Sequence, residues 1–257
     1  MDAFAHLFGD LGALTLGFAL IVGLVGGIVK GVVGFAMPMI MVSGLSSVMP
    51  PEWALAALIL PTLVTNVFQA LRQGLGAAWD STRRFKVFLM TGGVALVLAA
   101  QLVRSLPPTA LFLIIGLPVV AFALLQLSGR ALTLPGTSRR IEAGVGLFAG
   151  IMGGLSGIWG PPTVAYLTAT NTAKADQMRV QGVIYGLGSV ALLLAHLQSG
   201  VLRAETAPLS ALMVLPALIG MVIGVAIQDR IDQVMFRKVT LWVLLVVGLN
   251  LIRRAVF

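Results

Sequence analysis

Long runs of apolar residues, separated by short polar stretches, fill most of the 257-residue chain. Runs of about 18 or more apolar residues are typical of helices that cross a membrane. The clearest runs are 87–103, 109–127, 181–197, 207–227 and 239–252. A soluble protein of this length would have to bury all of that surface in one core. We therefore predict an all-α, polytopic membrane protein.

Two similar glycine-rich stretches occupy matching places in the two halves of the chain. Residues 24–38 read LVGGIVKGVVGFAMP, and residues 147–161 read LFAGIMGGLSGIWGP. They align without a gap, because Gly27 corresponds to Gly150 at an offset that holds throughout (150 − 27 = 123). The same order of apolar segments follows each stretch. This pattern indicates an internal duplication.

The predicted duplication divides the chain into a first membrane repeat at 1–128 and a second at 129–257. The apolar segments of the first half are 11–30, 35–49, 53–71, 84–104 and 108–127. Those of the second half are 141–156, 161–170, 178–197, 207–227 and 236–253. The second segment of each half is too short to cross a hydrocarbon core of ~30 Å at a rise of ~1.5 Å per residue. Each repeat is therefore predicted to contain a Gly/Pro-broken helical hairpin, re-entrant or made of two broken helices, and then three transmembrane helices.

Composition supports the membrane interpretation. Hydrophobic residues make up 58% of the chain and charged residues only 10%, whereas about 25% is usual for soluble domains. The net charge of +8 reflects basic residues in short loops rather than a basic patch, so we expect no nucleic-acid partner. Residues 1–10 contain no Lys or Arg, so we expect no cleaved signal peptide.

The loop charges also predict a topology. If each hairpin returns to its starting side, the loops 72–86, 128–142, 171–179 and 228–238 all lie in the cytoplasm. Most basic residues then lie inside, as the positive-inside rule requires. The outer side would carry Arg104, Arg203, Arg253 and Arg254. In this arrangement the two repeats are inverted, as in many secondary transporters.

The two glycine-rich motifs predict interrupted helices. Glycine permits positive φ angles and proline suits the first turn of a helix, so each chain should leave the helical conformation and restart at Pro38 or at Pro161–Pro162. Interrupted backbone inside a membrane is tolerated only where protein covers it or where it lines a cavity. A restarted helix presents its positive end, which favours an anion. The alternative is that these glycines only allow close helix packing.

Lys30 is the one basic residue well inside an apolar run. Intramembrane ionisable groups are costly and often functional, so Lys30 could meet an anionic substrate. Alternatively, its side chain could extend to the membrane interface. The second motif has Gly153 at the matching position.

Few polar residues interrupt the other apolar segments. Thr65, Asn66 and Gln69 share one helical face, and Gln181, Tyr185 and Ser189 form a stripe at a spacing of four. These residues could line a substrate path or could bond neighbouring helices. His196 is the one titrating group near neutral pH inside a segment, and is therefore a proton-coupling candidate.

Several kinds of chemistry have no residues here to support them. The chain contains no Cys, and its nine acidic residues fall in loops or at segment ends, so no buried carboxylate relay is expected. It has no phosphate-binding loop and no zinc-protease motif. We expect no metal, no cofactor and no enzyme activity. The absence of internal acids and the presence of Lys30 favour an anionic substrate over a cation.

The chain resembles the sulfite exporter TauE/SafE family of bacterial inner-membrane transporters. The matching stretches are GIVKGVVGFAMPMI at 27–40 and GIMGGLSGIWGPPTV at 150–164, and the likeness extends over nearly the whole chain. Family members resemble duplicated units that each open with such a motif. The first copy departs from the usual consecutive glycines at Lys30 and Phe35–Ala36. The resemblance implies export of sulfite, of sulfonates such as sulfoacetate, or of other small organic anions.

We therefore expect a multi-pass transporter in the bacterial inner membrane that exports a small organosulfur anion by alternating access. An anion channel, or a carrier for a small non-sulfur carboxylate, is the alternative. The expected partners are the anion and the lipid bilayer, and the oligomeric state is open between monomer and homodimer. The expected substrate-binding residues are Lys30, Gly31, Gly34, Phe35, Pro38, Asn66, Gln69, Gly154, Gly157, Trp159, Gly160, Pro161, Gln181 and Tyr185.

Overall fold

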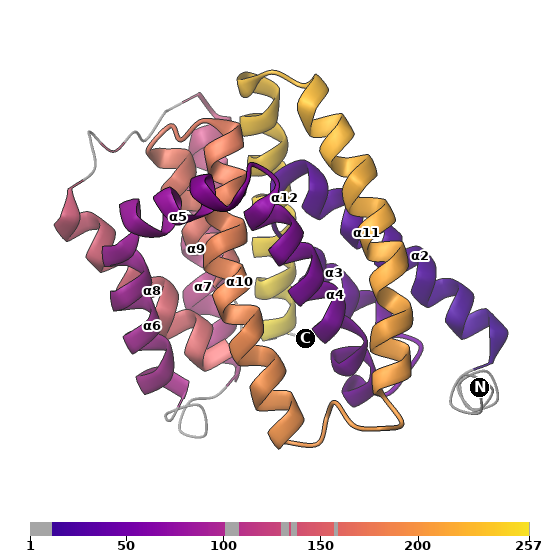
Figure 1. Ribbon diagram of the computed structural model, residues 1–257. Helices are drawn as coiled ribbons and strands as arrows, with labels where there is room; N and C mark the ends of the chain where they lie inside the picture. The colour runs from indigo at the N-terminus through magenta and orange to yellow at the C-terminus, as the bar shows by residue number, and fades with distance from the viewer. Residues whose placement is uncertain (1–11, 101–107, 130–133, 135–137, 157–158, 257) are drawn as a thin grey trace. The chain divides into compact units, whose positions relative to one another are not determined.

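The described part of the chain is helical. The computed structural model describes residues 12–100, 108–129, 134, 138–156 and 159–256, and these contain no strand. The all-α prediction is therefore confirmed (Figure 1). The helices are α2 Ala13–Val33, α3 Met37–Leu45, α4 Pro51–Leu71, α5 Leu75–Arg84, α6 Lys86–Ala100, α7 Pro108–Leu127, α8 Arg139–Ser156, α9 Gly160–Ala169, α10 Lys174–Gln198, α11 Ala207–Arg230 and α12 Gln233–Val256.

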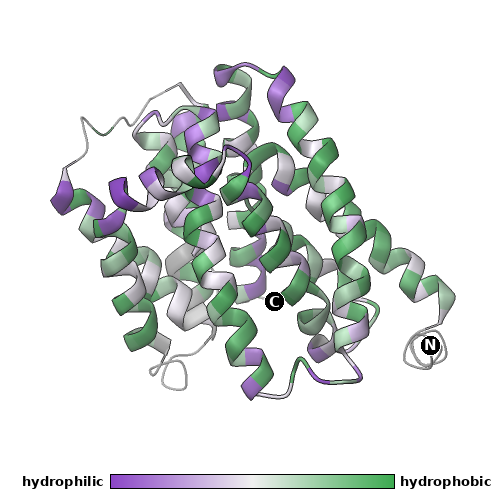
Figure 2. Cartoon of the chain, in the orientation of Figure 1, coloured by the Kyte–Doolittle hydropathy of each residue, from purple (hydrophilic) through white to green (hydrophobic). Residues whose placement is uncertain are grey.

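Five of the described helices are long and apolar enough to cross a membrane. They are α2, α4, α10, α11 and α12, with spans of 20 to 25 residues. Shorter apolar stretches lie in α6 and α7. Figure 2 shows hydrophobic residues along most of α2 and α11, and hydrophilic residues mainly at helix ends and in α5. The prediction of a polytopic membrane protein is confirmed.

The first glycine-rich motif interrupts a helix as predicted. Helix α2 ends at Val33, and Gly34 follows in the left-handed conformation with φ of 88°. Its N–H donates to the Lys30 carbonyl at 2.6 Å. Ala36 also has a positive φ, of 75°, and α3 begins at Met37 with Pro38 in its first turn. With nine residues, α3 is about 14 Å long and cannot cross a membrane.

The second motif also lies where one helix ends and another begins. Helix α8 ends at Ser156, and α9 begins at Gly160 with prolines in its first turn. Helix α9 has ten residues, so it is about 15 Å long and is also too short to span. Gly157 lies outside the described residues. Both halves therefore contain the predicted Gly/Pro-broken pair of helices.

The segment 72–86, expected to be a loop, contains a helix. Helix α5 occupies Leu75–Arg84, starts after Gly74 at φ of 89°, and ends where the Phe85 N–H donates to the Ser81 carbonyl. Leu75 and Trp79 are exposed on one side, and Arg83 lies over the Trp79 ring. Since α5 is short and mixes apolar with charged residues, a search for long apolar runs does not detect it.

The chain forms two compact units that both draw on its two halves. Unit 1 comprises the chain up to Arg72 together with Gly182–Ile231, and unit 2 comprises Gln73–Gln181 with Asp232–Phe257. The units are a division in space and differ from the predicted repeats, which are a division of the sequence at residue 128. Each unit therefore contains helices from both halves of the chain.

Glycines allow α2 to pack across α11 in unit 1 (Figure 1). A Cβ added to Gly27 would lie 2.2 Å from the Ala217 carbonyl oxygen, and one on Gly31 would lie 2.4 Å from that of Met221. Such distances exclude any side chain unless the backbone shifts. For Gly27 and Gly31, close helix packing is therefore a sufficient reason for glycine.

The two ends of α4 are joined by ion pairs to the two ends of α11. Arg72 contacts Asp229 at 2.5 Å, and Arg203, which also contacts Glu205 at 2.6 Å, pairs with Glu52. The two helices therefore run in the same direction. Apolar side chains from both, and from the α2–α3 pair, form the core of unit 1: Leu16, Ala19, Val22, Met37, Met41, Leu45, Met49, Ala54, Ala57, Leu58, Leu209, Met213 and Ala217.

In unit 2, α6 packs on α8 and α7 packs on α12. A Cβ on Gly150 would lie 2.2 Å from the Gly92 carbonyl oxygen, so this contact also depends on glycine. The buried Glu142 carboxylate accepts the Phe88 N–H at 3.1 Å and caps the first turn of α6. Such caps satisfy N–H groups that have no partner inside the helix.

Polar contacts join three of the loops that were predicted to share the cytoplasmic side, 72–86, 171–179 and 228–238, and the end of α7. In unit 2, Arg237 donates to Asn171 at 2.7 Å and to Gln126 at 2.8 Å. The Gln73 amide donates to the Ala175 carbonyl at 3.0 Å. These contacts fit the topology in which the α8–α9 pair returns to the side on which it began.

Several helices of the two halves correspond in position, although α5 has no counterpart in the second half. The starts of α3 and α9, and those of α4 and α10, are 123 residues apart (160 − 37 and 174 − 51). The packing is also reciprocal: α2 of the first half packs on α11 of the second, and α8 of the second half packs on α6 of the first. These matches agree with an internal duplication.

Replacing Gly31 with Ala should destabilise the protein, because the new Cβ would lie 2.4 Å from a backbone oxygen of α11. We expect a loss of about 1–3 kcal/mol in the free energy of unfolding, typical of overpacking, measured by denaturation in detergent. The matched control is Gly93→Ala in α6, where no atom lies within 4 Å of the added Cβ. Equal stability of both variants would contradict the close packing of α2 on α11.

Candidate functional site

Lys30 is a buried cation with neutral partners. Lys30 is only 1% exposed, so its side chain does not extend to the membrane interface. Its ammonium donates to the Thr65 hydroxyl at 2.9 Å and to the Asn66 side-chain oxygen. An ammonium has three N–H donors, so one N–H has no acceptor among the described residues.

The partners of Lys30 belong to a polar stripe on α4. Thr62, Thr65, Asn66 and Gln69 recur at intervals of three and four residues and are all buried, as expected for one helical face. The Asn66 amide donates to the Tyr185 carbonyl of α10 at 3.0 Å. The Gln69 amide donates to the Gly34 carbonyl at 3.1 Å. The stripe therefore covers both the buried cation and the interrupted backbone.

The charge of Lys30 is not balanced by a carboxylate within the described part of the chain. The ion pairs of unit 1 lie at its helix ends and involve Arg72 and Arg203. Among the described residues of unit 1, Lys30 is the one buried charged side chain. An uncompensated buried charge is expensive, so this cluster is suited to an anion.

The cluster is joined by the positive end of α3. Met37, the first residue of α3, places its sulfur 4.0 Å from the Thr65 hydroxyl. The N–H groups at the start of a helix have no partners inside it, and the helix dipole adds partial positive charge there. The first residue of α3 therefore lies beside the Thr65 side of the Lys30 cluster.

Thr62 was not among the residues singled out in the sequence. Its hydroxyl is buried and has no hydrogen-bond partner in the described structure. It lies one turn before Asn66, on the face that holds Lys30. The signal that could have found it is the spacing of three and four that it shares with Thr65, Asn66 and Gln69.

The expected site residues are distributed over both units. Lys30, Asn66 and Gln69 meet in unit 1, where the Tyr185 carbonyl also takes part. Also in unit 1 are Gly31, Gly34, Phe35 and Pro38, of which Phe35 is buried. Unit 2 contains Gly154, Trp159, Gly160, Pro161 and Gln181.

The second motif has an aromatic ring where the first has a charge. A Cβ on Gly153, the counterpart of Lys30, would lie 3.0 Å from the Trp159 ring. The absence of a side chain at position 153 thus leaves room for the indole. Each motif lies between two helices, but the side chains around Lys30 and around Gly153 differ in chemistry.

His196 lies apart from the Lys30 cluster. It occupies the last turn of α10 and is partly exposed, and its Nδ1 lies 3.4 Å from the Ser199 hydroxyl. The Lys30 cluster contacts α10 at Tyr185 instead, three helical turns earlier. His196 therefore has no described contact with the groups around Lys30.

Apolar spanning helices, two broken helices and a buried cation together define a polytopic membrane protein of the transporter type. The family model for the sulfite exporter TauE/SafE matches residues 19–251. The chain therefore belongs to the sulfite exporter TauE/SafE family, a family of transporters. No curated protein and no solved structure matches the chain.

Replacing Asn66 with Leu should destabilise unit 1, because Lys30 loses an acceptor and the Tyr185 carbonyl loses a donor. We expect a loss of about 2–3 kcal/mol in the free energy of unfolding, since a buried charge is left with fewer partners. Denaturation in detergent measures it. Adding Lys30→Met to Asn66→Leu should recover most of the loss, because the charge is then gone.

The control is Asn250→Leu, which removes an exposed hydrogen bond to Arg253 and should change stability by less than about 0.5 kcal/mol. If the losses from Lys30→Met and Asn66→Leu simply add, the two side chains are not energetically coupled.

Proposed function

We propose that the chain is a secondary transporter that exports a small organosulfur anion, sulfite or a sulfonate such as sulfoacetate, across the bacterial inner membrane. Membership of the sulfite exporter family supports the direction and the substrate class. The proposed mechanism is alternating access, in which one bundle of helices rocks against another around the bound anion.

The observation that carries this proposal is the buried Lys30 ammonium with neutral partners. Thr65 and Asn66 orient the ammonium without cancelling its charge. An anion would take the remaining N–H and supply the missing negative charge. The bound anion would then offset the free-energy cost of burying the Lys30 charge. A transport site must both bind and release its anion, and neutral partners around Lys30 allow this.

Two neighbouring groups support the same interpretation. The buried Thr62 hydroxyl lacks a partner in the described structure and can donate to an anion oxygen. The start of α3 adds backbone N–H groups and the positive end of a helix dipole. Together with Lys30, these groups would replace part of the water shell that an anion leaves behind. Asn66, Gln69, Gln181 and Tyr185 are proposed to line the route.

Alternating access needs bodies that move as units. The chain divides into two compact units, and ion pairs at both ends of α4 and α11 hold those helices of unit 1 together. Each unit also contains one of the two broken helix pairs. These features support a carrier, while an anion channel or a carrier for small non-sulfur carboxylates remains the alternative.

Replacing Lys30 with Met should reduce export of sulfite from proteoliposomes by at least about tenfold, because the site loses the charge that pairs with the anion. The assay follows saturable flux of sulfite, sulfoacetate, taurine, sulfate and lactate at limiting concentration, with and without a pH gradient. Saturation at slow turnover indicates a carrier, whereas single-channel currents indicate a channel.

The matched control is Lys86→Met at the exposed start of α6, which removes the same charge outside the cluster and should transport normally. Normal flux in the Lys30→Met variant would remove Lys30 from the mechanism. Flux of lactate without flux of any sulfur anion would favour the carboxylate carrier.

A further inference from the structure

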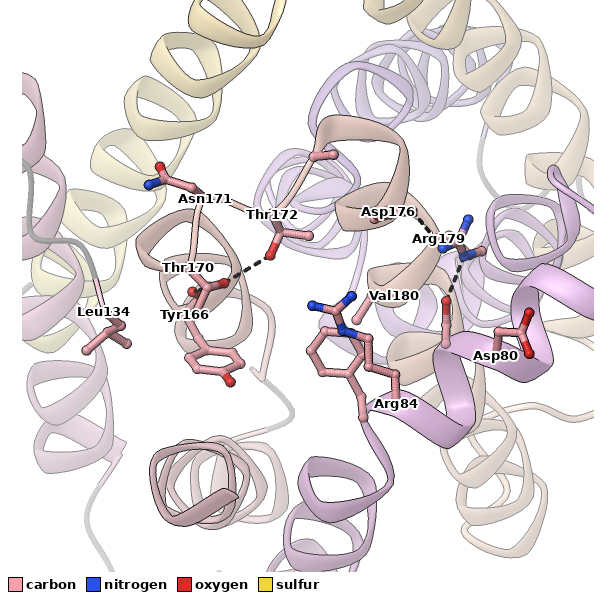
Figure 3. Close-up of a pocket in the computed structure, with 13 residues that line it drawn as sticks. Asp80, Arg84, Leu134, Tyr166, Thr170, Asn171, Thr172, Asp176, Arg179 and Val180 are labelled. Carbon is pink, nitrogen blue, oxygen red and sulfur yellow. Dashed lines mark hydrogen bonds and ion pairs between the residues drawn. The ribbon is translucent and has the colours of Figure 1, made fainter. Parts of the chain in front are cut away.

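Unit 2 contains a cavity that shares no residue with the Lys30 cluster. Its volume is about 530 Å³, and it lies between the end of α5, the turn from α9 to α10, and the first turns of α10 (Figure 3). Most of the residues that line it belong to the loops 72–86 and 171–179, which the charge pattern assigns to the cytoplasmic side. The cavity therefore faces the side from which an exporter takes its substrate.

One wall of the cavity is a fixed arginine. Arg179 donates to the Asp176 carboxylate at 2.6 Å and through Nε to the Ser81 hydroxyl at 2.6 Å. It also bonds to the side chain of Gln73. Asp176 balances its charge, so Arg179 mainly joins α5 to α10 and gives the cavity a defined shape.

Arg84 is the cation of the cavity that has no acidic partner. Its guanidinium lies 5.6 Å from the centre of the Phe85 ring, and no carboxylate is within ion-pair distance of it in the described structure. Figure 3 shows the guanidinium between the Thr170–Thr172 turn and Arg179, while the Asp80 carboxylate points away from it. Its planar set of N–H donors is thus available to a ligand.

Hydroxyl groups complete the lining opposite Arg84. The Thr170 and Thr172 hydroxyls are hydrogen-bonded to each other at 2.9 Å, and Tyr166 lines the same space. The first turn of α10 follows this turn of the chain and adds the positive end of a 25-residue helix. The Thr170 hydroxyl donates to the Tyr166 carbonyl at 3.0 Å and so accepts from Thr172, which leaves the guanidinium as the main donor of the cavity. Guanidinium groups bind planar pairs of oxygen atoms with two parallel hydrogen bonds.

We infer that this cavity binds a small oxyanion, such as a sulfonate or sulfite, through Arg84, and that it captures substrate on the cytoplasmic side before transport. The identity of the ligand rests on the proposed function, whereas the site itself rests on the cavity and on its unpaired arginine. Capture here raises the local concentration of anion at the protein and so matters most when substrate is scarce.

The test measures equilibrium binding of radiolabelled sulfite to purified protein that carries Lys30→Met, so that the cavity is the one proposed site left. Adding Arg84→Gln should weaken this binding by at least about tenfold, the loss expected for a charge-assisted pair of hydrogen bonds. Arg84→Lys keeps the charge but loses the planar fork, so its affinity should fall between the two. Excess methanesulfonate should displace the sulfite.

The matched control is Arg83→Gln. Arg83 is the neighbouring residue of α5, has the same charge, lies over Trp79 and does not line the cavity. It should leave binding unchanged. Equal losses in Arg83→Gln and Arg84→Gln would assign the effect to overall surface charge, and no loss in either would mean that the cavity binds no oxyanion. Either result overturns the inference.

Transport by the single variants separates this inference from the proposed function. With Lys30 intact, Arg84→Gln should lower the initial rate at low sulfite and leave the maximal rate close to normal. If Lys30→Met transports normally while Arg84→Gln still loses binding, the proposed role of Lys30 fails and the capture site stands. If Lys30→Met abolishes transport and Arg84→Gln binds normally, the reverse holds.

Discussion

Inside a membrane no water is available to satisfy a broken backbone or a buried charge, and unit 1 is organised around that constraint. The left-handed Gly34 and Ala36 interrupt the chain between α2 and α3, and Gln69 of α4 donates to the buried Gly34 carbonyl. The adjacent Thr65 and Asn66 bind the Lys30 ammonium. One stripe on α4 therefore takes the place of water for both polar features, and this ties α2, α3 and α4 together.

Glycine has two separate roles in the first motif. At Gly27 and Gly31 it removes a side chain so that the backbones of α2 and α11 can approach closely. At Gly34 it allows the positive φ that ends α2. The last two turns of α2 thus pack tightly on α11 and lead into the interruption of the helix. The second motif repeats the close packing at Gly150, but the Trp159 ring fills the space beside Gly153, the position that matches Lys30. The two motifs therefore carry different chemistry.

The elements that the sequence predicted correctly are those with a local signal. Apolar runs indicated the long helices, and the Gly–Pro pairs indicated both breaks close to their observed positions at Met37 and Gly160. Helix α5 escaped detection because ten residues of mixed character carry no membrane-scale hydropathy signal. Thr62 was missed because one threonine in an apolar helix is unremarkable until its hydroxyl is found buried without a partner. Lys30 was ambiguous in the sequence, since only its burial shows that the side chain does not extend to an interface.

The sequence by itself therefore determined the all-α membrane class and the two interrupted helices, because hydropathy and backbone preference are properties of contiguous residues. The internal duplication stays a prediction from the repeat spacing. Only the tertiary structure shows which helices of the two halves belong to each compact unit. It also shows which acceptors bind Lys30, and that Arg84 lines a cavity beside the α9–α10 turn. These features join residues far apart in the chain, such as Lys30 with Thr65 or Ser81 with Arg179. Their partners are chosen by packing and by the need to satisfy polar groups away from water, which no local pattern records.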